Sequence, residues 1–247
     1  MTLPQLTESE RGVIARTWAF RAESERRAER RFARLTRELI HTGAAEPVIE
    51  LTRSAVEQER RHTVICDRLA TEFGWQGSPS EVVPEPEALG PTELCQKDRL
   101  LFEMMAFCCF TETLNSALLV HVLRRVQAPQ IRAAVHEIVQ DEVSHSRAGW
   151  AHLHACCGQG QGAFLSDLLP LMMELSQVQA IFGRDPSRDG PRMAAYGELD
   201  DASRIQIFRG VMRDVFYPGL EGLGIQTHSA RTWLAAVDPG EDAHTLS

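Results

Sequence analysis

The sequence predicts an all-helical protein, a four-helix bundle with one long crossover connection and additional C-terminal helices. Three observations predict this fold class. Leu, Ala, Arg and Glu, which favour helices, dominate the composition. Val, Ile and Thr rarely alternate with polar residues, so strands are expected to be scarce. Long segments carry apolar residues at steps of three and four, and one long stretch rich in Pro, Gly and Ser divides them into two pairs.

Start and stop signals place the elements along the chain. Thr7 and Glu10 form a capping-box pattern, and Gly43 suits the end of the first helix. Pro47 and Pro129 suit the first turn of a helix. We expect long helices at residues 7–41, 47–73, 92–126 and 129–157, a linker at 74–91, shorter helices at 166–182, 201–217 and 228–237, a loop at 183–192, and a disordered tail at 238–247. These elements are interpreted as a single domain, residues 1–247, with a core bundle at 7–157 and C-terminal accessory helices within 164–237.

Composition excludes several classes of protein. The 247 residues carry a formal net charge of −8, whereas a nucleic-acid-binding protein needs a basic surface. The six cysteines form no CxxC pair, so we expect buried thiols in a reducing, cytoplasmic compartment rather than disulfides or a thiolate zinc site. No secretory signal is visible, and no uninterrupted apolar run reaches about 18 residues, so no membrane span is expected.

The pattern Glu-x-x-His is the main indication of chemistry. It occurs four times, at Glu38/His41, Glu59/His62, Glu142/His145 and Glu241/His244. A pattern this frequent is informative only where both residues lie on the buried stripe of a helix. The second and third copies meet that condition, whereas the first lies off its stripe at a helix end and the fourth lies in the polar tail.

Each long helix interrupts its apolar stripe with one carboxylate near its middle. These carboxylates are Glu25, Glu59, Glu112 and Glu142, and two of them are followed one turn later by His62 and His145. Glu25 precedes Glu59 by 34 residues, and Glu112 precedes Glu142 by 30. If one helix runs up the bundle and the next runs back down, these spacings place the two residues of each pair at the same height along the bundle.

A buried carboxylate costs several kcal/mol unless it is paired or bound to a metal. Four carboxylates and two imidazoles at one level therefore predict two divalent metal ions. Each Glu-x-x-His pair can give one metal an imidazole nitrogen while its Glu bridges to the other metal, and the remaining two glutamates can bind terminally. Oxygen and imidazole ligands with open positions fit iron or manganese better than zinc.

The same motifs carry a resemblance to known proteins. The chain resembles the ferritin-like diiron-carboxylate proteins, and more narrowly bacterial diiron oxygenases of the aldehyde-deformylating type. The resemblance covers about two-thirds of the chain. It rests on ESERRAERRFARL (23–35), EQERRH (57–62), FTETLNSALL (110–119) and QDEVSHSRAGW (140–150), with a weaker similarity in FYPGLEGLGI (216–225). It implies a ferritin-like fold and the six metal ligands named above.

The resemblance also implies a function. The protein is expected to be an enzyme that uses two Fe ions, or an Mn/Fe pair, and O2 to oxidise a small, rather apolar substrate. Hydroxylation, N-oxygenation, desaturation and C–C cleavage all remain open. Electrons would come from a separate ferredoxin-like or flavin reductase, and the protein would be a monomer or homodimer. Two alternatives stay open, namely a ferroxidase or iron-handling protein that forms a large shell, and a metal-free helical binding protein.

Several residues near the predicted ligands have two interpretations each. Asp141 either supports His62 by a hydrogen bond, as such an Asp does in this superfamily, or forms a surface salt bridge with an Arg. Thr111, Asn115 and Ser116 flank Glu112 and either hold a metal-bound water or are satisfied polar groups of the core.

His152 lies two turns after His145 and is either a hydrogen-bonded core histidine or a seventh ligand. Glu23 and Glu29 compete with Glu25 for the role of ligand on the first helix, and Glu25 is preferred because it alone fits the apolar stripe.

Overall fold

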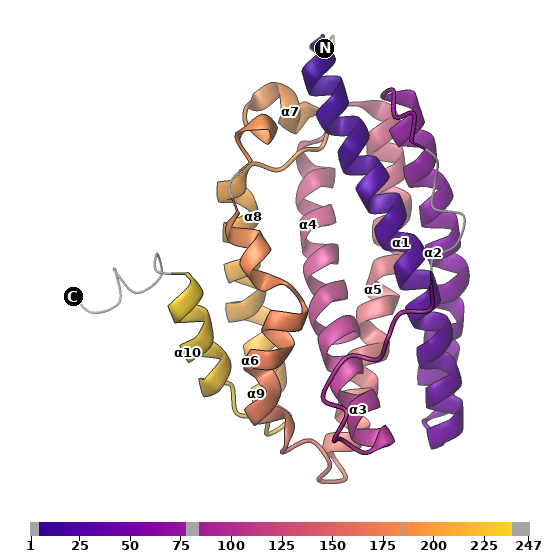
Figure 1. Ribbon diagram of the computed structural model, residues 1–247, viewed down its shortest axis with the longest axis vertical. Coiled ribbons are helices and arrows are strands. Elements are labelled where there is room, and N and C mark those ends of the chain that lie inside the picture. The colour runs from indigo at the N-terminus through magenta and orange to yellow at the C-terminus, as the bar shows by residue number, and fades with distance from the viewer. Residues whose placement is uncertain (1–4, 78–83, 184, 239–247) are drawn as a thin grey trace, which may run out of the picture.

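The computed structural model describes residues 5–77, 84–183 and 185–238, and within these ranges the chain forms helices and loops with no strand. The all-helical prediction is therefore confirmed for this part of the chain (Figure 1). The elements are α1 (Glu8–Thr42), α2 (Glu46–Glu72), α3 (Gln96–Glu103), the π-helical η1 (Met104–Thr111), α4 (Glu112–Arg125), α5 (Pro129–Cys157), α6 (Leu165–Leu175), the 3₁₀ turns η2 (Val178–Phe182) and η3 (Pro186–Arg188), α7 (Pro191–Ala195), α8 (Asp201–Val211), the π-helical η4 (Met212–Phe216), α9 (Tyr217–Glu221) and α10 (His228–Val237).

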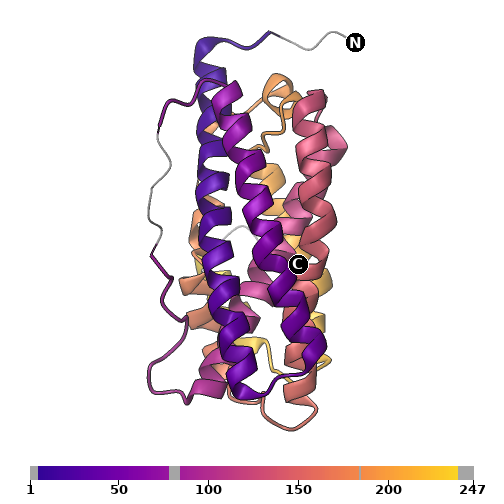
Figure 2. The same ribbon diagram turned by 90° about the vertical axis from the view of Figure 1, so that its right-hand side faces the viewer.

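Four long helical rods lie side by side, namely α1, α2, the continuous α3–η1–α4 and α5 (Figures 1 and 2). Helix α1 packs along α2, α2 packs against α5, and α5 packs against both η1 and α4. The chain leaves α2 near the top of Figure 2 and enters α3 near the bottom, so the connection between them returns along the length of the bundle.

The ends of α1 follow their sequence signals. The Thr7 hydroxyl accepts from the Glu10 backbone N–H at 3.3 Å, and the Glu10 carboxylate accepts from the Thr7 backbone N–H at 2.7 Å. This reciprocal pair satisfies N–H groups that a helix start leaves free. Gly43 ends α1 with φ at 73°, a left-handed conformation that glycine adopts without a steric penalty.

The third rod departs from the expected uniform helix at 92–126. It begins at Gln96, four residues later than expected, and its middle is the π-helical η1. The Thr111 hydroxyl donates to the Ala106 carbonyl at 3.0 Å, across five residues. A π-helical turn rotates the residues after it relative to those before it, and such turns are frequent at functional sites. Here the turn ends immediately before Glu112.

Close packing holds η1 against α5. A Cβ atom on Gly149 would lie 2.6 Å from the Cys108 Cβ and 2.8 Å from the Cys109 backbone nitrogen. Only glycine allows this approach of α5 to η1. Because Gly149 lies one turn after His145, the contact fixes the distance between His145 and the rod that carries Glu112.

The third rod is also the most apolar part of the described chain. By length and composition alone, Gln96–Arg125 is the one stretch of the described helices that could cross a membrane. In the structure it is a core helix of the bundle, with Leu100 to Phe110 buried throughout. Its apolar character is accounted for by this burial.

The C-terminal elements lie along one side of the bundle, where α7 and α8 contact α4 (Figure 1). The helix expected at 166–182 ends at Leu175, and a left-handed Gln177 with φ at 54° separates it from η2. The expected loop at 183–192 contains η3 and the first residues of α7. The helix expected at 201–217 continues through η4 to Glu221, whereas α10 matches its prediction.

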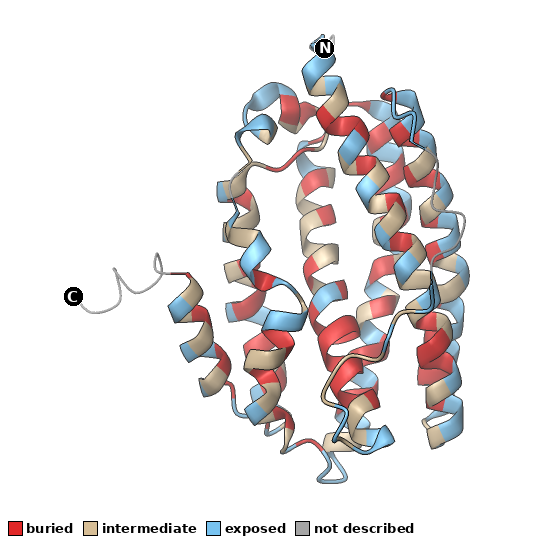
Figure 3. Ribbon diagram, in the orientation of Figure 1, coloured by how far each residue is buried: buried red, intermediate tan, exposed pale blue. Residues whose placement is uncertain are grey.

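A continuous apolar core joins the bundle to these C-terminal helices, with buried residues from α1 through α10 (Figure 3). The sequence predicts disorder at 238–247, but only Asp238 of this segment lies within the described residues. The middle of the 74–91 linker, residues 78–83, also lies outside the described residues.

The prediction for the cysteines is only partly correct. All six are free, and Cys66, Cys108 and Cys109 are buried as expected. Cys95 is exposed because it lies in the connection just before α3, and Cys156 and Cys157 are half-buried at the end of α5.

Candidate metal centre

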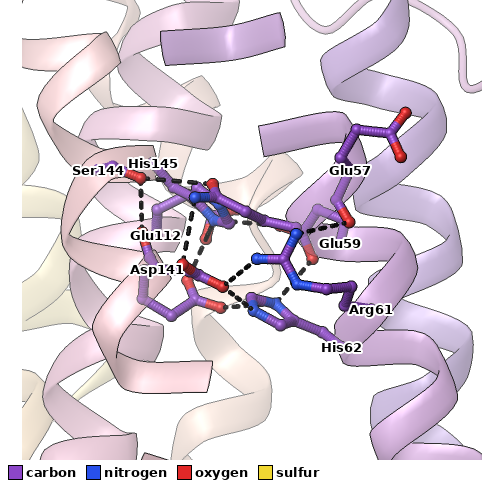
Figure 4. A network of polar contacts seen from close by, with 10 residues as sticks. Glu57, Glu59, Arg61, His62, Glu112, Asp141, Ser144 and His145 are labelled. Carbon is purple, nitrogen blue, oxygen red and sulfur yellow. Dashed lines mark hydrogen bonds and ion pairs between the residues drawn. The ribbon is translucent and has the colours of Figure 1, made fainter. Parts of the chain in front are cut away.

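All six predicted ligands meet in the interior of the bundle. Each of the four rods supplies one carboxylate, and α2 and α5 add one imidazole each; the residues are Glu25, Glu59, His62, Glu112, Glu142 and His145. None of the six is more than 5% exposed. Figure 4 shows Glu59, Glu112 and the two imidazoles converging from opposite sides of the bundle.

These residues form two groups that share two members. Glu25, Glu59, His62 and Glu142 form one group, and Glu59, Glu112, Glu142 and His145 form the other. Within each group, one potential ligand atom per residue lies within 4.8 Å of every other. Glu59 and Glu142 belong to both groups, whereas each remaining residue belongs to one.

The two shared carboxylates span the two imidazoles. Glu59 places Oε1 3.2 Å from His145 Nδ1 and Oε2 3.5 Å from His62 Nδ1. Glu142 places Oε2 3.5 Å from His145 Nδ1 and Oε1 3.7 Å from His62 Nδ1. Each shared carboxylate therefore presents one oxygen to each group, which is the geometry of a carboxylate that bridges two cations.

Contacts on the outer side of each imidazole set its tautomer. His62 Nε2 lies 3.1 Å from Asp141 Oδ2, and His145 Nε2 lies 2.9 Å from Gln58 Oε1. Both partners are acceptors, so each Nε2 carries the proton and donates it. In the neutral form of each ring, Nδ1 is then left with a lone pair that faces the carboxylates, as a metal ligand requires.

The inner atoms of the cluster are buried and lack hydrogen-bond partners. These atoms are both carboxylate oxygens of Glu59, both of Glu142, and Nδ1 of His62 and of His145. Buried polar groups are normally satisfied, because leaving one unpaired costs about 1–3 kcal/mol. Six unpaired acceptor atoms facing one another fit a site for cations.

The pKa values of the cluster also indicate a site for cations. Burial and, after it, the Glu112 carboxylate raise the pKa of Glu142 to about 7 against the opposing effect of His145. Burial raises the pKa of Glu25 well above its ordinary value, and it also raises the pKa values of Glu59 and Glu112. Burial alone would lower the pKa of His145, but the surrounding carboxylates outweigh it and raise this pKa well above the ordinary value. The site as a whole is short of positive charge.

Asp141 combines the two roles that the sequence left open. Its Oδ2 contacts His62 and also accepts from Arg61 at 2.9 Å, while its Oδ1 accepts from the Gln58 amide at 3.1 Å (Figure 4). Sequence reasoning missed Gln58. A signal for it exists, because Gln58 directly precedes Glu59 as Asp141 directly precedes Glu142, so the two Glu-x-x-His helices present equivalent neighbours.

Thr111 and Asn115 lie beside the cluster. Both line a cavity that also reaches Glu25 and Glu112. The Thr111 hydroxyl donates a hydrogen bond to the Ala106 carbonyl, whereas Ser116 has a buried hydroxyl without a hydrogen-bond partner.

Other candidate residues lie outside the two groups. His152 lines a separate cavity, its Nε2 lies 3.8 Å from Cys156 Sγ, and burial lowers its pKa to about 4. Glu23 pairs with Arg26 and Arg27, and Glu29 pairs with Arg60. Of the discounted Glu-x-x-His copies, Glu38 pairs with Arg34, and Glu241 and His244 lie outside the described residues.

No protein-family model, curated protein or solved structure matches this chain.

Proposed function

We propose that this protein is a ferritin-like non-haem diiron oxidase or oxygenase. The observation that carries the proposal is the pair of shared carboxylates, Glu59 and Glu142, each with one oxygen facing each imidazole. Two groups with common members suit two adjacent cations rather than one. Glu25 belongs to one group and Glu112 to the other, so they would bind terminally.

The fold supports the choice of protein class. Four long rods, a connection that returns along the bundle between the second and third rods, and a Glu-x-x-His pair on each of two helices are typical of ferritin-like diiron proteins. Four carboxylates and two imidazoles form a hard donor set, which favours iron, alone or with manganese. When bound, the two metals would supply the reduction of dioxygen.

The chain's own residues would hold and shield this centre. Asp141 and Gln58 fix the outer nitrogen of each imidazole, so that both inner nitrogens stay available. Phe32 packs against His145 with the rings tilted and their centroids 5.0 Å apart, and together with Phe107 it would keep water from one side of the cluster. The cavity beside Glu25 and Glu112 would admit an organic substrate. Electrons would come from a separate reductase.

Metal content is the first test of this proposal. Elemental analysis of the wild-type chain after anaerobic Fe(II) loading is expected to give about two metal ions per chain, because the six ligands form two groups. Glu142→Ala should lose both ions, since Glu142 serves both groups. Glu137→Ala, which alters an exposed carboxylate on the same helix, should keep them.

Failure of the loaded wild-type chain to retain metal would overturn the proposal. Two ions retained in a large shell that oxidises and stores Fe(II) would instead favour iron handling. Dioxygen uptake by a non-shell protein supplied with a reductant would favour the oxygenase.

Asp141 is expected to position His62 for metal binding. Asp141→Asn keeps an acceptor but removes its charge, so metal affinity should fall about ten- to a hundredfold. The affinity is measured by competition with a chelator. The control is Asp67→Asn, which removes a carboxylate of α2 that pairs with Arg26. Equal affinities in both variants, at equal stability of the metal-free chains, would contradict the positioning role.

A further inference from the structure

A cavity of about 490 Å³ lies between α1, α4 and the segment around η3 to α8. Its size is in the range of about 300–1,000 Å³ that is usual for small-molecule sites. Its lining includes Glu25 and Glu112, one from each group of the candidate centre. A molecule in this cavity would therefore lie next to the metals of the proposed function.

Most of the cavity wall is apolar. Phe107, Leu114, Leu118 and Leu199 are among its lining residues. Phe20 also lines the cavity and is 73% exposed, which places it at the opening. This wall favours a hydrocarbon chain or ring.

Three guanidinium groups line the cavity as well, namely those of Arg21, Arg188 and Arg204. Arg188 pairs with Asp185 at 3.0 Å, and Arg204 pairs with Asp201. Arg21 has no ion-pair partner within the described chain, and its guanidinium lies over the Trp18 ring, 5.7 Å from the ring centroid.

The polar groups of this wall that lack a partner are N–H donors. Arg204 Nε is buried without a hydrogen-bond partner, and the Arg21 guanidinium forms no ion pair with a carboxylate of the described residues. Glu198 is the opposing acid in the cavity. It is buried and accepts from the Thr17 hydroxyl; burial raises its pKa, and the charges of Arg188 and Arg21 oppose this rise, although neither guanidinium forms an ion pair with it. The unmet need is therefore for an anionic acceptor rather than for a cation.

We propose that the cavity binds a small apolar carboxylic acid, with its carboxylate at Arg21 and its hydrocarbon part directed towards Glu25 and Glu112. This assignment of substrate class rests on the proposed function. Arg21 and Glu25 are one turn apart on α1, so their backbone positions differ by about 6 Å along the helix axis. The carbon nearest the metals is consequently several bonds away from the carboxylate.

The test is a comparison of three eight-carbon probes that differ only in the head group. Octanoate, octan-1-ol and octylamine are titrated into the full chain by calorimetry, with and without bound metal. Octanoate is expected to bind about ten- to a hundredfold more tightly than the other two, because a hydrogen bond to a charged group adds about 1.5–3 kcal/mol. Arg21→Gln should remove this preference without weakening octan-1-ol. Arg27→Gln, an exposed change on the same helix, should leave all three affinities unchanged.

Each other outcome overturns the assignment. If octanoate binds no better than the alcohol, or if octylamine binds best, the cavity does not select an anion. If octanoate binds only to the metal-loaded chain and equally well to Arg21→Gln, its carboxylate is a metal ligand rather than a partner of Arg21. The proposed function is tested separately, because two bound metals with no octanoate preference would refute the substrate class alone.

Discussion

The metal-free chain is expected to become more stable when Glu59 and Glu142 are both replaced by glutamine, even though metal binding is lost. In the metal-free state, both carboxylates are buried with no hydrogen-bond partner on any of their four oxygens. Glutamine keeps the shape and removes the charge. It also removes the carboxylates that favour a protonated His145, and it offers amide donors to the Nδ1 atoms of the neutral imidazoles. Relief of an uncompensated buried charge is worth several kcal/mol, so a gain of about 2 kcal/mol is a conservative expectation.

The measurement is denaturant unfolding in the presence of a chelator, together with the metal content of each variant. Glu57→Gln is the matched control, since Glu57 lies on α2 two residues before Glu59, is 65% exposed and pairs with Arg60. Glu57→Gln should change neither the free energy of unfolding nor the metal content. With metal present the order should reverse, because wild type gains binding free energy that the double variant cannot. A double variant that is less stable than wild type in chelator would show that the carboxylates stabilise the fold without a cation.

This conflict between stability and chemistry explains why the centre was visible in the sequence. A helix stripe that faces a core should be apolar at every step, and a carboxylate there lowers stability unless a partner compensates. Glu25, Glu59, Glu112 and Glu142 each break such a stripe, and the stripes place them at one level. The spacing along regular helices was enough to predict that these residues meet.

Features that depend on irregular backbone or on tertiary contacts were not predictable in this way. The π-helical η1 leaves no signature in its apolar sequence MMAFCCFT, and Gly149 reads as an ordinary residue of α5 until Cys108 is seen against it. Arg21 belongs to a sequence rich in arginine and glutamate. Its role at the cavity depends on Gly197–Leu199, which lie more than 170 residues away along the chain.

The stability of the metal-free chain is expected to fall as pH rises from 5 to 8. Glu142 has a pKa of about 7 in the folded chain and an ordinary value of 4.5. Below pH 4.5 the group is protonated in both folded and unfolded chains, and its contribution to stability is fully present. Between 4.5 and 7 the unfolded chain releases this proton while the folded chain keeps it, so stability is lost as pH rises through the folded pKa.

The pKa values of Glu25, Glu59 and Glu112 are raised as well, so they act in the same direction. That of His145 is also raised, and its contribution is lost only above its ordinary value of 6.5. Surface carboxylates with lowered pKa values, such as Asp200 and Asp214, lose their contribution only on acidification below about pH 4. These surface groups therefore do not titrate in the pH 5–8 window. His152 does, because its folded pKa of about 4 lies below its ordinary value of 6.5, and its contribution raises stability as pH rises. The share of the buried cluster is therefore read from the difference between wild type and Glu142→Gln.

Glu142 alone should lower the free energy of unfolding by about 2.5 kcal/mol between pH 5 and pH 8, since one pKa unit corresponds to about 1.4 kcal/mol. Guanidinium unfolding in chelator at several pH values measures this change, and Glu142→Gln should flatten it. The metal-loaded chain should behave in the opposite way, because metal binding displaces protons from the carboxylates and from any protonated imidazole and so strengthens with pH. The two stability curves should therefore diverge with rising pH. If Glu142→Gln leaves the slope of the metal-free curve between pH 5 and 7 unchanged, the four carboxylates share protons or water that relieve their repulsion, and the need for cations at this level of the bundle disappears.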